Sequence, residues 1–176
     1  IETEAERASA VIADYLEFCK PTDLVLQRIP VRMPLSKAAA ALKMRMDDRD
    51  VVLETHWDEE EAVLGSERHL IQLFTIIFNN AIDAMPLGGR LSVCVQRAAD
   101  QVLVLIADTG AGISPEVKAR LFEPFATSRS ASGGTGLGLS IARWITLKHS
   151  GEITLHSPGP AQGTEVEVSF PRPPKS

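Results

Sequence analysis

Hydrophobic positions in the first twenty residues recur at spacings of three and four, which is the period of an amphipathic helix. The apolar stripe consists of Ala8, Val11, Ile12, Tyr15, Leu16 and Cys19, and Pro21 ends the pattern. Such a helix is stable only when its stripe is buried against a partner. Beyond Pro21 the pattern changes to short segments that alternate between strand and helix periods.

The rest of the chain predicts an alternation of strands and helices. Apolar runs predict strands over residues 29–32, 51–57, 62–64, 91–96, 102–107, 153–156 and 164–170. Helical spacing predicts helices from Pro34 or Ser36 to Met46, from an N-cap at Ser66 to about Met85, over 116–121 and over 136–149, with an irregular loop over 122–134. Hairpin pairs dominate the second half. We therefore expect an α/β fold, a two-layer sandwich with a mixed, mostly antiparallel sheet and helices on one face.

Composition and charge narrow the class of protein. The 176 residues suffice for one domain with its own core, and 44% hydrophobic with 23% charged residues is ordinary for a soluble protein. The formal net charge of -5 argues against nucleic acid as a partner. Two distant cysteines, Cys19 and Cys94, predict neither a disulfide framework nor a zinc site.

The chain shows no targeting or membrane segment. No apolar run approaches the ~18 residues that span a bilayer, and no signal peptide is visible. The chain begins with Ile1 rather than Met, so we expect a fragment of a longer protein. We expect a cytoplasmic location for these residues, which is compatible with a membrane-anchored parent.

Two glycine-rich segments are candidates for binding phosphate. One runs from Asp108 to Ile113 directly after an apolar strand, and the other runs from Gly133 to Leu139 and opens a helix. Glycine allows close approach of a ligand to the backbone, and a helix N-terminus offers free N–H groups to an anion. Neither segment has the spacing of a P-loop or of a Rossmann fingerprint. The alternative is that both are an ordinary turn and an ordinary helix start.

Two adjacent asparagines, Asn79 and Asn80, lie within a predicted helix, where asparagine is a mediocre residue. A neutral side-chain oxygen beside phosphates is a suitable Mg²⁺ ligand. The alternative is that Asn79 is exposed and Asn80 satisfies a buried backbone group. The asparagine pair by itself leaves both interpretations open.

Taken together, these segments resemble the nucleotide-binding domain of the GHKL ATPase superfamily, specifically that of sensor histidine kinases. The resemblance runs from about Gly65 to Phe170, and its boxes follow the family's order. They are Asn79-Asn80-Ala81, Asp108-Thr109-Gly110-Ala111-Gly112, Leu121-Phe122-Glu123-Pro124-Phe125, Gly134-Thr135-Gly136-Leu137-Gly138-Leu139 and Gly163-Thr164. The resemblance implies a Bergerat-type fold with ATP and Mg²⁺ as ligands.

The resemblance also implies a role for individual residues. Asp108 would accept a hydrogen bond from the adenine amine, with Thr164 close by. Asn80 would coordinate Mg²⁺ and act in catalysis, while Arg129 would pair with the γ-phosphate or else be an exposed loop arginine. The other nucleotide-binding residues that it implies are Gly110, Gly112, Phe122, Phe125, Thr135, Gly136, Leu137 and Gly138. Phe122 and Phe125 would pin a mobile lid over about 114–135.

Three positions depart from the family's pattern. Ile76 lies four residues before Asn80, where many relatives have a second Asn and other GHKL ATPases have a glutamate that activates water, so we expect poor hydrolysis of ATP. Asp83 stands where one kinase subgroup has a Lys that touches phosphate. Ser66 replaces a frequent Asp and caps a helix equally well.

We therefore expect residues 1–21 to end a dimerisation helix, 22–171 to form a catalytic ATP-binding domain, and 172–176 to be a frayed tail. The expected activity is protein-histidine kinase in a two-component phosphorelay, with a histidine-bearing dimerisation domain and a response regulator receiver domain as partners and a homodimeric full-length protein. None of the four histidines is followed by an acidic residue, so we expect the acceptor histidine upstream of Ile1. The alternatives are a nucleotide-binding regulatory module without turnover and an anti-sigma serine kinase.

Overall fold

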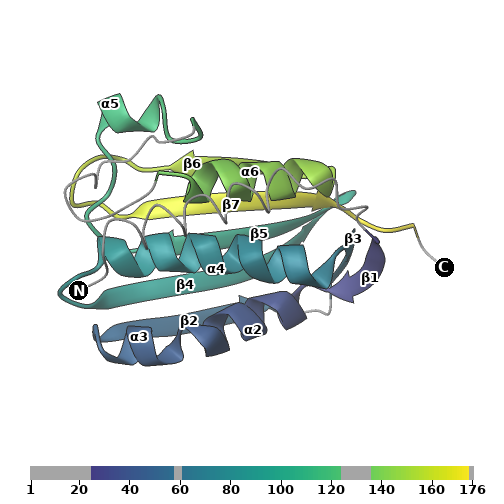
Figure 1. Cartoon of the computed structure of the whole chain (residues 1–176), viewed down its shortest axis with the longest axis horizontal. Helices are drawn as coiled ribbons and strands as arrows, with labels where there is room; N and C mark the ends of the chain where they lie inside the picture. Colours follow the sequence, from purple (N-terminus) through teal and green to yellow (C-terminus); the bar gives the residue numbers. More distant parts are fainter. Residues whose placement is uncertain (1–24, 58–60, 124–135, 175–176) are drawn as a thin grey trace, which may run out of the picture.

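The computed structural model describes residues 25–57, 61–123 and 136–174 (Figure 1). In chain order the elements are β1 (Gln27–Pro30), α2 (Arg32–Ala41), α3 (Lys43–Asp47), β2 (Val51–Trp57), β3 (Ala62–Gly65), α4 (Glu67–Ala84), β4 (Gly89–Ala98), β5 (Gln101–Asp108), α5 (Pro115–Lys118), α6 (Gly138–Lys148), β6 (Glu152–His156) and β7 (Thr164–Pro171). The helix expected over the first twenty residues and most of the loop expected over 122–134 lie outside the described ranges.

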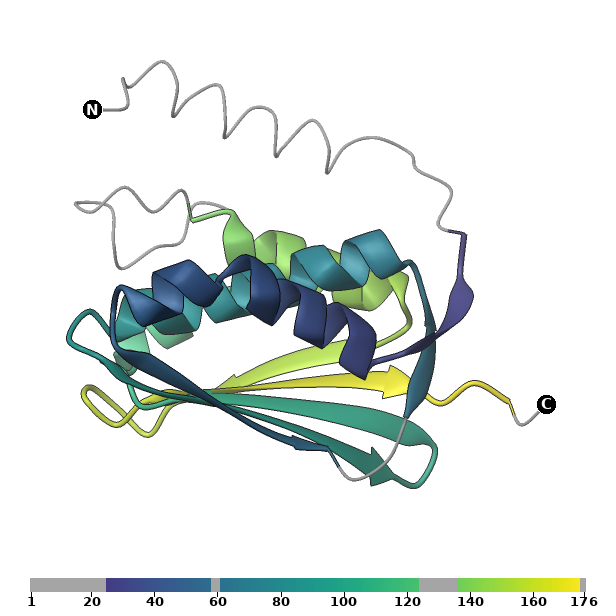
Figure 2. The same ribbon diagram turned by 90° about the horizontal axis from the view of Figure 1, so that it is seen from below.

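Five strands form one mixed sheet in the order β2-β4-β5-β7-β6. The β2–β4 pair is parallel, and the other neighbouring pairs are antiparallel. Strands β1 and β3 form a separate antiparallel pair. Helices α2, α3, α4 and α6 lie on one side of the five-stranded sheet (Figure 2). This arrangement confirms the fold class expected from the sequence.

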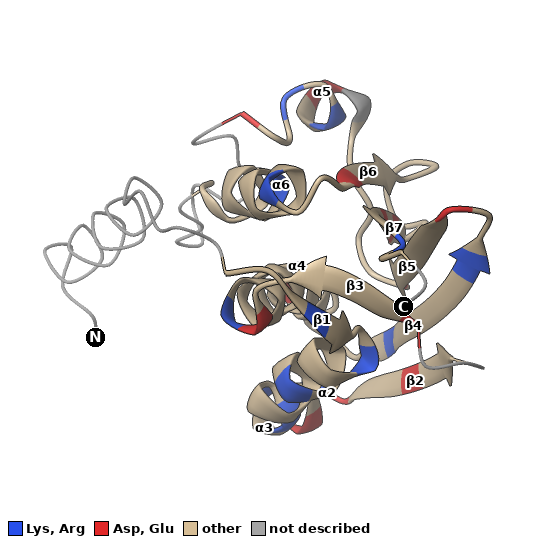
Figure 3. Cartoon of the chain, turned by 90° about the vertical axis from the view of Figure 1, so that its right-hand side faces the viewer, with Lys and Arg blue, Asp and Glu red and all other residues tan. Residues whose placement is uncertain are grey.

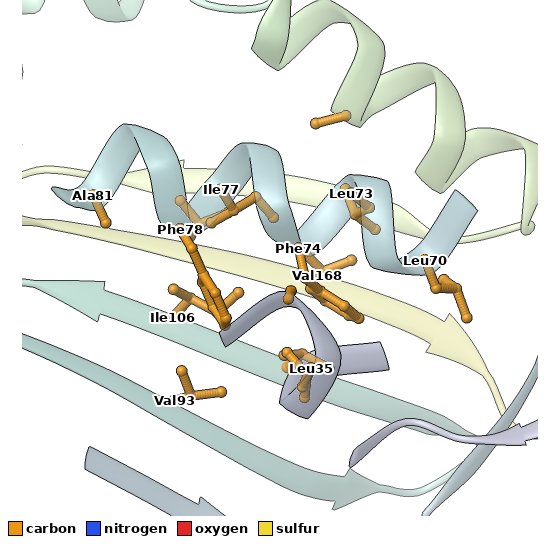
Figure 4. Packing of buried hydrophobic residues seen from close by; sticks show 14 of the residues in the cluster. Leu35, Leu70, Leu73, Phe74, Ile77, Phe78, Ala81, Val93, Ile106 and Val168 are labelled. Carbon is orange, nitrogen blue, oxygen red and sulfur yellow. The ribbon is translucent and has the colours of Figure 1, made fainter. Parts of the chain in front are cut away.

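Helix α4 is the centre of the hydrophobic core. Its apolar side chains recur at helical spacing and are almost fully buried, among them Leu70, Leu73, Phe74, Ile77, Phe78 and Ala81. In Figure 4, Phe74 and Phe78 project from α4 toward the sheet. Burying each large apolar side chain contributes about 1.5–3 kcal/mol, so this helix is held firmly against the sheet. The polar residues of its C-terminal half are thereby fixed relative to the strand ends.

The segment expected as one helix from Pro34 or Ser36 to Met46 is two helices with a different start. Helix α2 begins at Arg32, so Pro34 lies in its first turn. A proline is tolerated there because the first N–H groups of a helix have no intrahelical partner. The helical geometry is interrupted at Leu42, whose φ and ψ are -106° and 5°, and α3 follows from Lys43.

The start of α4 is held by histidine and not by a serine cap. Ser66 occupies the predicted N-cap position with extended backbone, but its side chain makes no capping hydrogen bond. Its hydroxyl pairs with Nδ1 of His69 at 2.8 Å, and its backbone N–H donates to Nε2 of His149 at 3.0 Å. His69 is half-buried.

His149 is fixed in a neutral form by its two partners. Its Nδ1 lies 2.7 Å from the carbonyl oxygen of Ile145, so Nδ1 carries the proton and Nε2 is left to accept from Ser66. The side chain is only 3% exposed, and burial lowers its pKa against the opposing effect of the Ile145 hydrogen bond. The same imidazole therefore ties the end of α6 to the beginning of α4.

The helices of the described ranges include none that is long and apolar enough to cross a membrane.

Candidate nucleotide site

The first glycine-rich segment turns sharply at the end of β5. Asp108 is the last residue of that strand and is half-buried, and its Oδ1 accepts a hydrogen bond from the backbone N–H of Gly110 at 2.8 Å. This bond folds the carboxylate over its own loop. A carboxylate has further acceptor positions beyond this one, so Asp108 is suited to accept from a ligand amine as well.

Thr164 lies directly opposite Asp108 in the β5–β7 ladder. Side chains two residues apart on a strand point to the same face of the sheet. Asp108 is two residues from the buried Ile106, and Thr164 is two residues from the buried Val166, so both side chains point to the face that the helices cover. Thr164 is 8% exposed. The structure therefore places together two residues that the sequence assigned to adenine from distant segments.

The glycines of this loop permit close packing against the protein itself. A Cβ at Gly110 would lie 2.6 Å from the carbonyl oxygen of Ala84, the last residue of α4, and that oxygen accepts from the N–H of Ala111 at 2.9 Å. Gly112 has a φ of 66°, and a Cβ there would lie 2.1 Å from the carbonyl oxygen of Gly159. The loop is consequently locked between the end of α4 and the segment before β7.

Asn80 lies on α4 one turn before Ala84, so it is close to the point where the Asp108 loop docks. On its other side it faces the start of α6, where a Cβ at Gly138 would lie 4.0 Å from Nδ2 of Asn80 and 3.3 Å from Cγ2 of Ile76. Helix α6 begins at Gly138 with no side-chain cap and no acidic residue in its first turn. Its first N–H groups are therefore suited to an anion.

The structure thus brings the main predicted residues to one end of α4: Asp108, Gly110, Gly112, Thr164, Asn80 and Gly138. Gly136 has a φ of 69°, and Leu137 is buried at the N-cap position of α6. The remaining predicted residues, Phe125, Arg129 and Thr135, lie outside the described ranges, as does most of the expected lid.

Phe122 contacts helix α6. The guanidinium of Arg143 lies over its ring at 5.6 Å, a cation–π contact with the exposed face of α6. An open groove of about 470 Å³ runs beside this pair and is lined by Phe122, Arg143, Leu147, Gly151, Glu152 and Ile153. These contacts hold Phe122 against α6.

Sequence reasoning missed two arginines at the same end of α4. Arg45 of α3 donates to Oδ1 of Asn79 and contacts Oδ1 of Asp83 at 2.5 Å, and Arg49 reaches the same Asp83 oxygen at 2.9 Å. Nothing in the sequence pattern signals this pairing, because Arg45 belongs to a five-residue helix far upstream. The one signal that could have pointed to these arginines is the charge of Asp83. An acid beside an expected phosphate site needs a positive charge to balance it.

Comparison with known proteins agrees with this geometry. Sporulation kinase A of Bacillus subtilis (strain 168) is 28% identical over 172 residues, which cover 97% of this chain and 28% of that protein. The structure of the mycobacterial sensor histidine kinase MprB is 26% identical with a TM-score of 0.75, covering 86% of this chain and all of that one. Histidine kinase ThkA, in a crystal structure with the response regulator protein TrrA, superposes with a TM-score of 0.80 at 21% identity, covering 97% of this chain and 48% of that one.

The chain spans less than half the length of the curated relatives it matches. Residues 65–174 contain Asn80, the Asp108 loop, the start of α6 and Thr164, and they match one family along their whole length. The chain therefore belongs to the family described as histidine kinase-, DNA gyrase B- and HSP90-like ATPases, and residues 65–174 form its ATP-binding domain.

Proposed function

We propose that this chain is the catalytic, ATP-binding part of a two-component sensor histidine kinase, and that it transfers the γ-phosphoryl group of ATP to a histidine on a dimerisation domain. The observation that carries the proposal is the meeting of Asn80, the Asp108–Thr164 pair and the start of α6 at one end of α4. The likeness to sensor histidine kinases over nearly the whole chain supports it.

Asp108 and Thr164 are suited to hold adenine. The exocyclic amine of adenine donates a hydrogen bond, and the Asp108 carboxylate accepts one. Guanine carries a carbonyl oxygen at the same place, which would face the carboxylate and leave two acceptors without a donor. Thr164, on the same face of the sheet, adds a hydroxyl that both donates and accepts. This pair therefore favours ATP over GTP.

Asn80 is suited to hold Mg²⁺ together with the phosphates. The described residues include no group of three His, Cys, Asp or Glu side chains that could hold a metal ion by themselves. A single amide oxygen completed by phosphate oxygens and water is a shell that Mg²⁺ commonly adopts. When bound, Mg²⁺ neutralises charge that develops on the phosphate oxygens. Asn80 would hold the ion, and the N–H groups at the start of α6 would bind phosphate oxygens.

Ile76 argues against hydrolysis of ATP by water. It lies one turn before Asn80, is partly buried, and packs against the core. An apolar side chain cannot take a proton from water. The domain would hold ATP without a base for hydrolysis, so productive reaction depends on a nucleophile that a partner supplies in line with the γ-phosphate.

The partners follow from this chemistry. The nucleophile would be a histidine of the dimerisation domain, whose last turns we assign to residues 1–21. The product phosphohistidine would then be consumed by an aspartate of a response regulator receiver domain, a proposal supported by the crystal structure of ThkA with TrrA. Two of the chain's four histidines fit the acceptor role poorly, since His149 is buried and His69 is bonded to Ser66.

A phosphotransfer assay tests the proposal. Incubation of the chain with γ-labelled ATP should leave it without acid-labile, base-stable label. Adding the parent's histidine-bearing dimerisation domain at high concentration, to offset the lost tether, should label that domain. ATP binding without any label on the added domain would instead support a regulatory module without turnover, the second candidate, which Ile76 favours.

A further inference from the structure

A compact charged cluster joins α3 to the last turns of α4. Both arginines converge on one carboxylate oxygen, with Nη2 of Arg45 at 2.5 Å and Nη1 of Arg49 at 2.9 Å from Oδ1 of Asp83. Nη1 of Arg45 also donates to Oδ1 of Asn79, and Nη1 of Arg49 donates to the carbonyl oxygen of Ile82 at 3.3 Å. Each guanidinium is thus held at two points of α4.

The residues of this cluster carry more positive than negative charge. Two permanently charged guanidinium groups share a single carboxylate. Other acids follow on the same segment, but Asp47, Asp48 and Asp50 are exposed, and Asp47 forms an ion pair with Lys43 of α3. Charged residues of both signs along α3 are visible in Figure 3.

Stability alone is a weak reason for such an arrangement. The side chains of Arg45, Arg49 and Asp83 are 38%, 35% and 31% exposed, and ion pairs exposed to this degree contribute little to folding. Two cations on one oxygen also repel each other, which lowers the gain further. A nearby anion would relieve that repulsion.

The cluster lies where the triphosphate of ATP is expected. Asp83 follows Asn80 by three residues, and Asn79 precedes it by one, so all three share the last turns of α4. A carboxylate one turn from the Mg²⁺-holding residue would repel phosphate if it stood alone. The arginines neutralise it and leave a positive charge beside Asn80.

We propose that Arg45 is a phosphate-positioning residue, held by Asn79 and Asp83 so that its charge acts on the terminal phosphates of bound ATP, while Arg49 balances Asp83. This inference rests on the proposed function. It assigns to α3 a part in nucleotide binding. Asp83 cannot make the phosphate contact that a Lys makes at its position in one kinase subgroup, and Arg45 of α3 would supply a positive charge in its place. The ligand class that the cluster recognises is a nucleoside polyphosphate rather than a nucleoside.

The test compares ATP with adenosine. Calorimetry in excess Mg²⁺ should show that Arg45→Gln raises the Kd for ATP about fivefold, as expected for one partly exposed charge contact, and leaves the Kd for adenosine unchanged. Arg45→Lys should recover part of the ATP affinity because it keeps the charge. High salt should shrink the ATP effect. Lys43→Gln is the matched control, since Lys43 lies on the same helix and pairs with Asp47, and it should change neither Kd.

The outcomes separate this inference from the proposed function. If Arg45→Gln weakens ATP and adenosine equally, or leaves ATP affinity unchanged while the wild-type chain binds it, Arg45 has only a structural role and the inference is wrong. If the wild-type chain binds neither ligand, the proposed function is wrong. Thermal unfolding of each variant checks that it folds. If Arg45→Gln does not fold, the comparison of Arg45→Lys with the wild-type chain still decides the test.

Discussion

Asp108 and Thr164 stand directly opposite each other in the β5–β7 ladder, at the end of one strand and the start of the other, with both side chains on the helix-covered face. The pair is fixed by the whole ladder, because eight consecutive residues of β5 are in register with β7 from Gln101 to Asp108. The two groups that we propose to hold adenine therefore need no movement of the sheet before they can act together.

Replacing Asp108 with Asn should weaken ATP binding. The substitution keeps the shape of the side chain but turns one acceptor into a donor that faces the adenine amine. Losing a hydrogen bond to a charged group costs about 1.5–3 kcal/mol, which is roughly a tenfold to hundredfold rise in Kd. Titration calorimetry with ATP and GTP measures the change. Equal affinity of the wild-type chain for the two nucleotides would contradict the assignment of Asp108 to adenine.

Replacing Asn80 with Ala should weaken ATP binding in a Mg²⁺-dependent way. The amide oxygen is the ligand that we assign to the ion, and alanine removes it while preserving the helix. The Kd for ATP should rise in Mg²⁺ and change little in EDTA. An equal loss in both conditions would show that Asn80 supports the fold alone. Asn79→Ala is not a suitable control because Asn79 binds Arg45, whereas Gln72→Ala, earlier on α4, is.

The sequence was sufficient to predict elements and residues whose signal is local. The strand over 51–57 and the two-layer sandwich of sheet and helices were predicted correctly, because alternation and apolar runs depend on neighbouring residues. The meeting of Asp108 with Thr164 could be expected only through the family resemblance. Helix periodicity also identified α4, since its buried face repeats over five turns.

Contacts between segments that are distant in the chain could not be predicted from the sequence. Serine is a typical capping residue, but the hydroxyl of Ser66 bonds to His69. Its backbone N–H donates to His149, because the end of α6 packs beside it. Pro34 was expected near a helix start, and the true start lies two residues earlier, where the first turn tolerates a residue without an N–H. Arg45 and Asp83 carry no local sign of their pairing.

Glu61 should matter for stability although it lies far from the nucleotide residues in sequence. Its carboxylate is 6% exposed and contacts Arg97 at 2.7 Å and Arg172 at 3.4 Å. Glu61→Gln removes the charge that balances both guanidinium groups. Because the arginines are themselves partly exposed, we expect a loss of about 1–2 kcal/mol in the free energy of unfolding, less than for a fully buried pair.

The matched control is Glu54→Gln. Glu54 also pairs with an arginine, Arg90 at 3.3 Å, but its side chain is 39% exposed and that of Arg90 60%. Such a surface pair contributes at most about 1 kcal/mol. Urea unfolding of the two variants compares the sites directly, and a loss at Glu54 as large as that at Glu61 would count against the importance of burial.

Stability should fall as the pH decreases below about 6.5, because two histidines are held neutral in the folded chain. Burial lowers the pKa of His149, against the Ile145 hydrogen bond that raises it. The pKa of His69 is lowered by burial first, and then by electrostatic interaction with His149 and Arg68. In the unfolded chain both groups titrate near the ordinary histidine pKa of about 6.5.

The sign follows from proton binding. Below pH 6.5 the unfolded chain binds protons that the folded chain still excludes, so the free energy of unfolding decreases as the pH falls toward the lower folded-state pKa values. Above pH 6.5 the contribution of both histidines is fully present. Protonation of His149 at Nε2 would also remove the acceptor that holds the N–H of Ser66, which loosens the start of α4.

Urea unfolding between about pH 7 and pH 5 tests this linkage above the range where most carboxylates titrate. His149→Gln should flatten the pH dependence, because one of the two titrating groups is gone. If His149→Gln is too unstable to measure, an NMR titration of the His149 imidazole in the wild-type chain gives its pKa directly. A value at or above 6.5 there, or an unchanged slope in His149→Gln, would show that the Ser66–His149 contact is not sensitive to pH in this way.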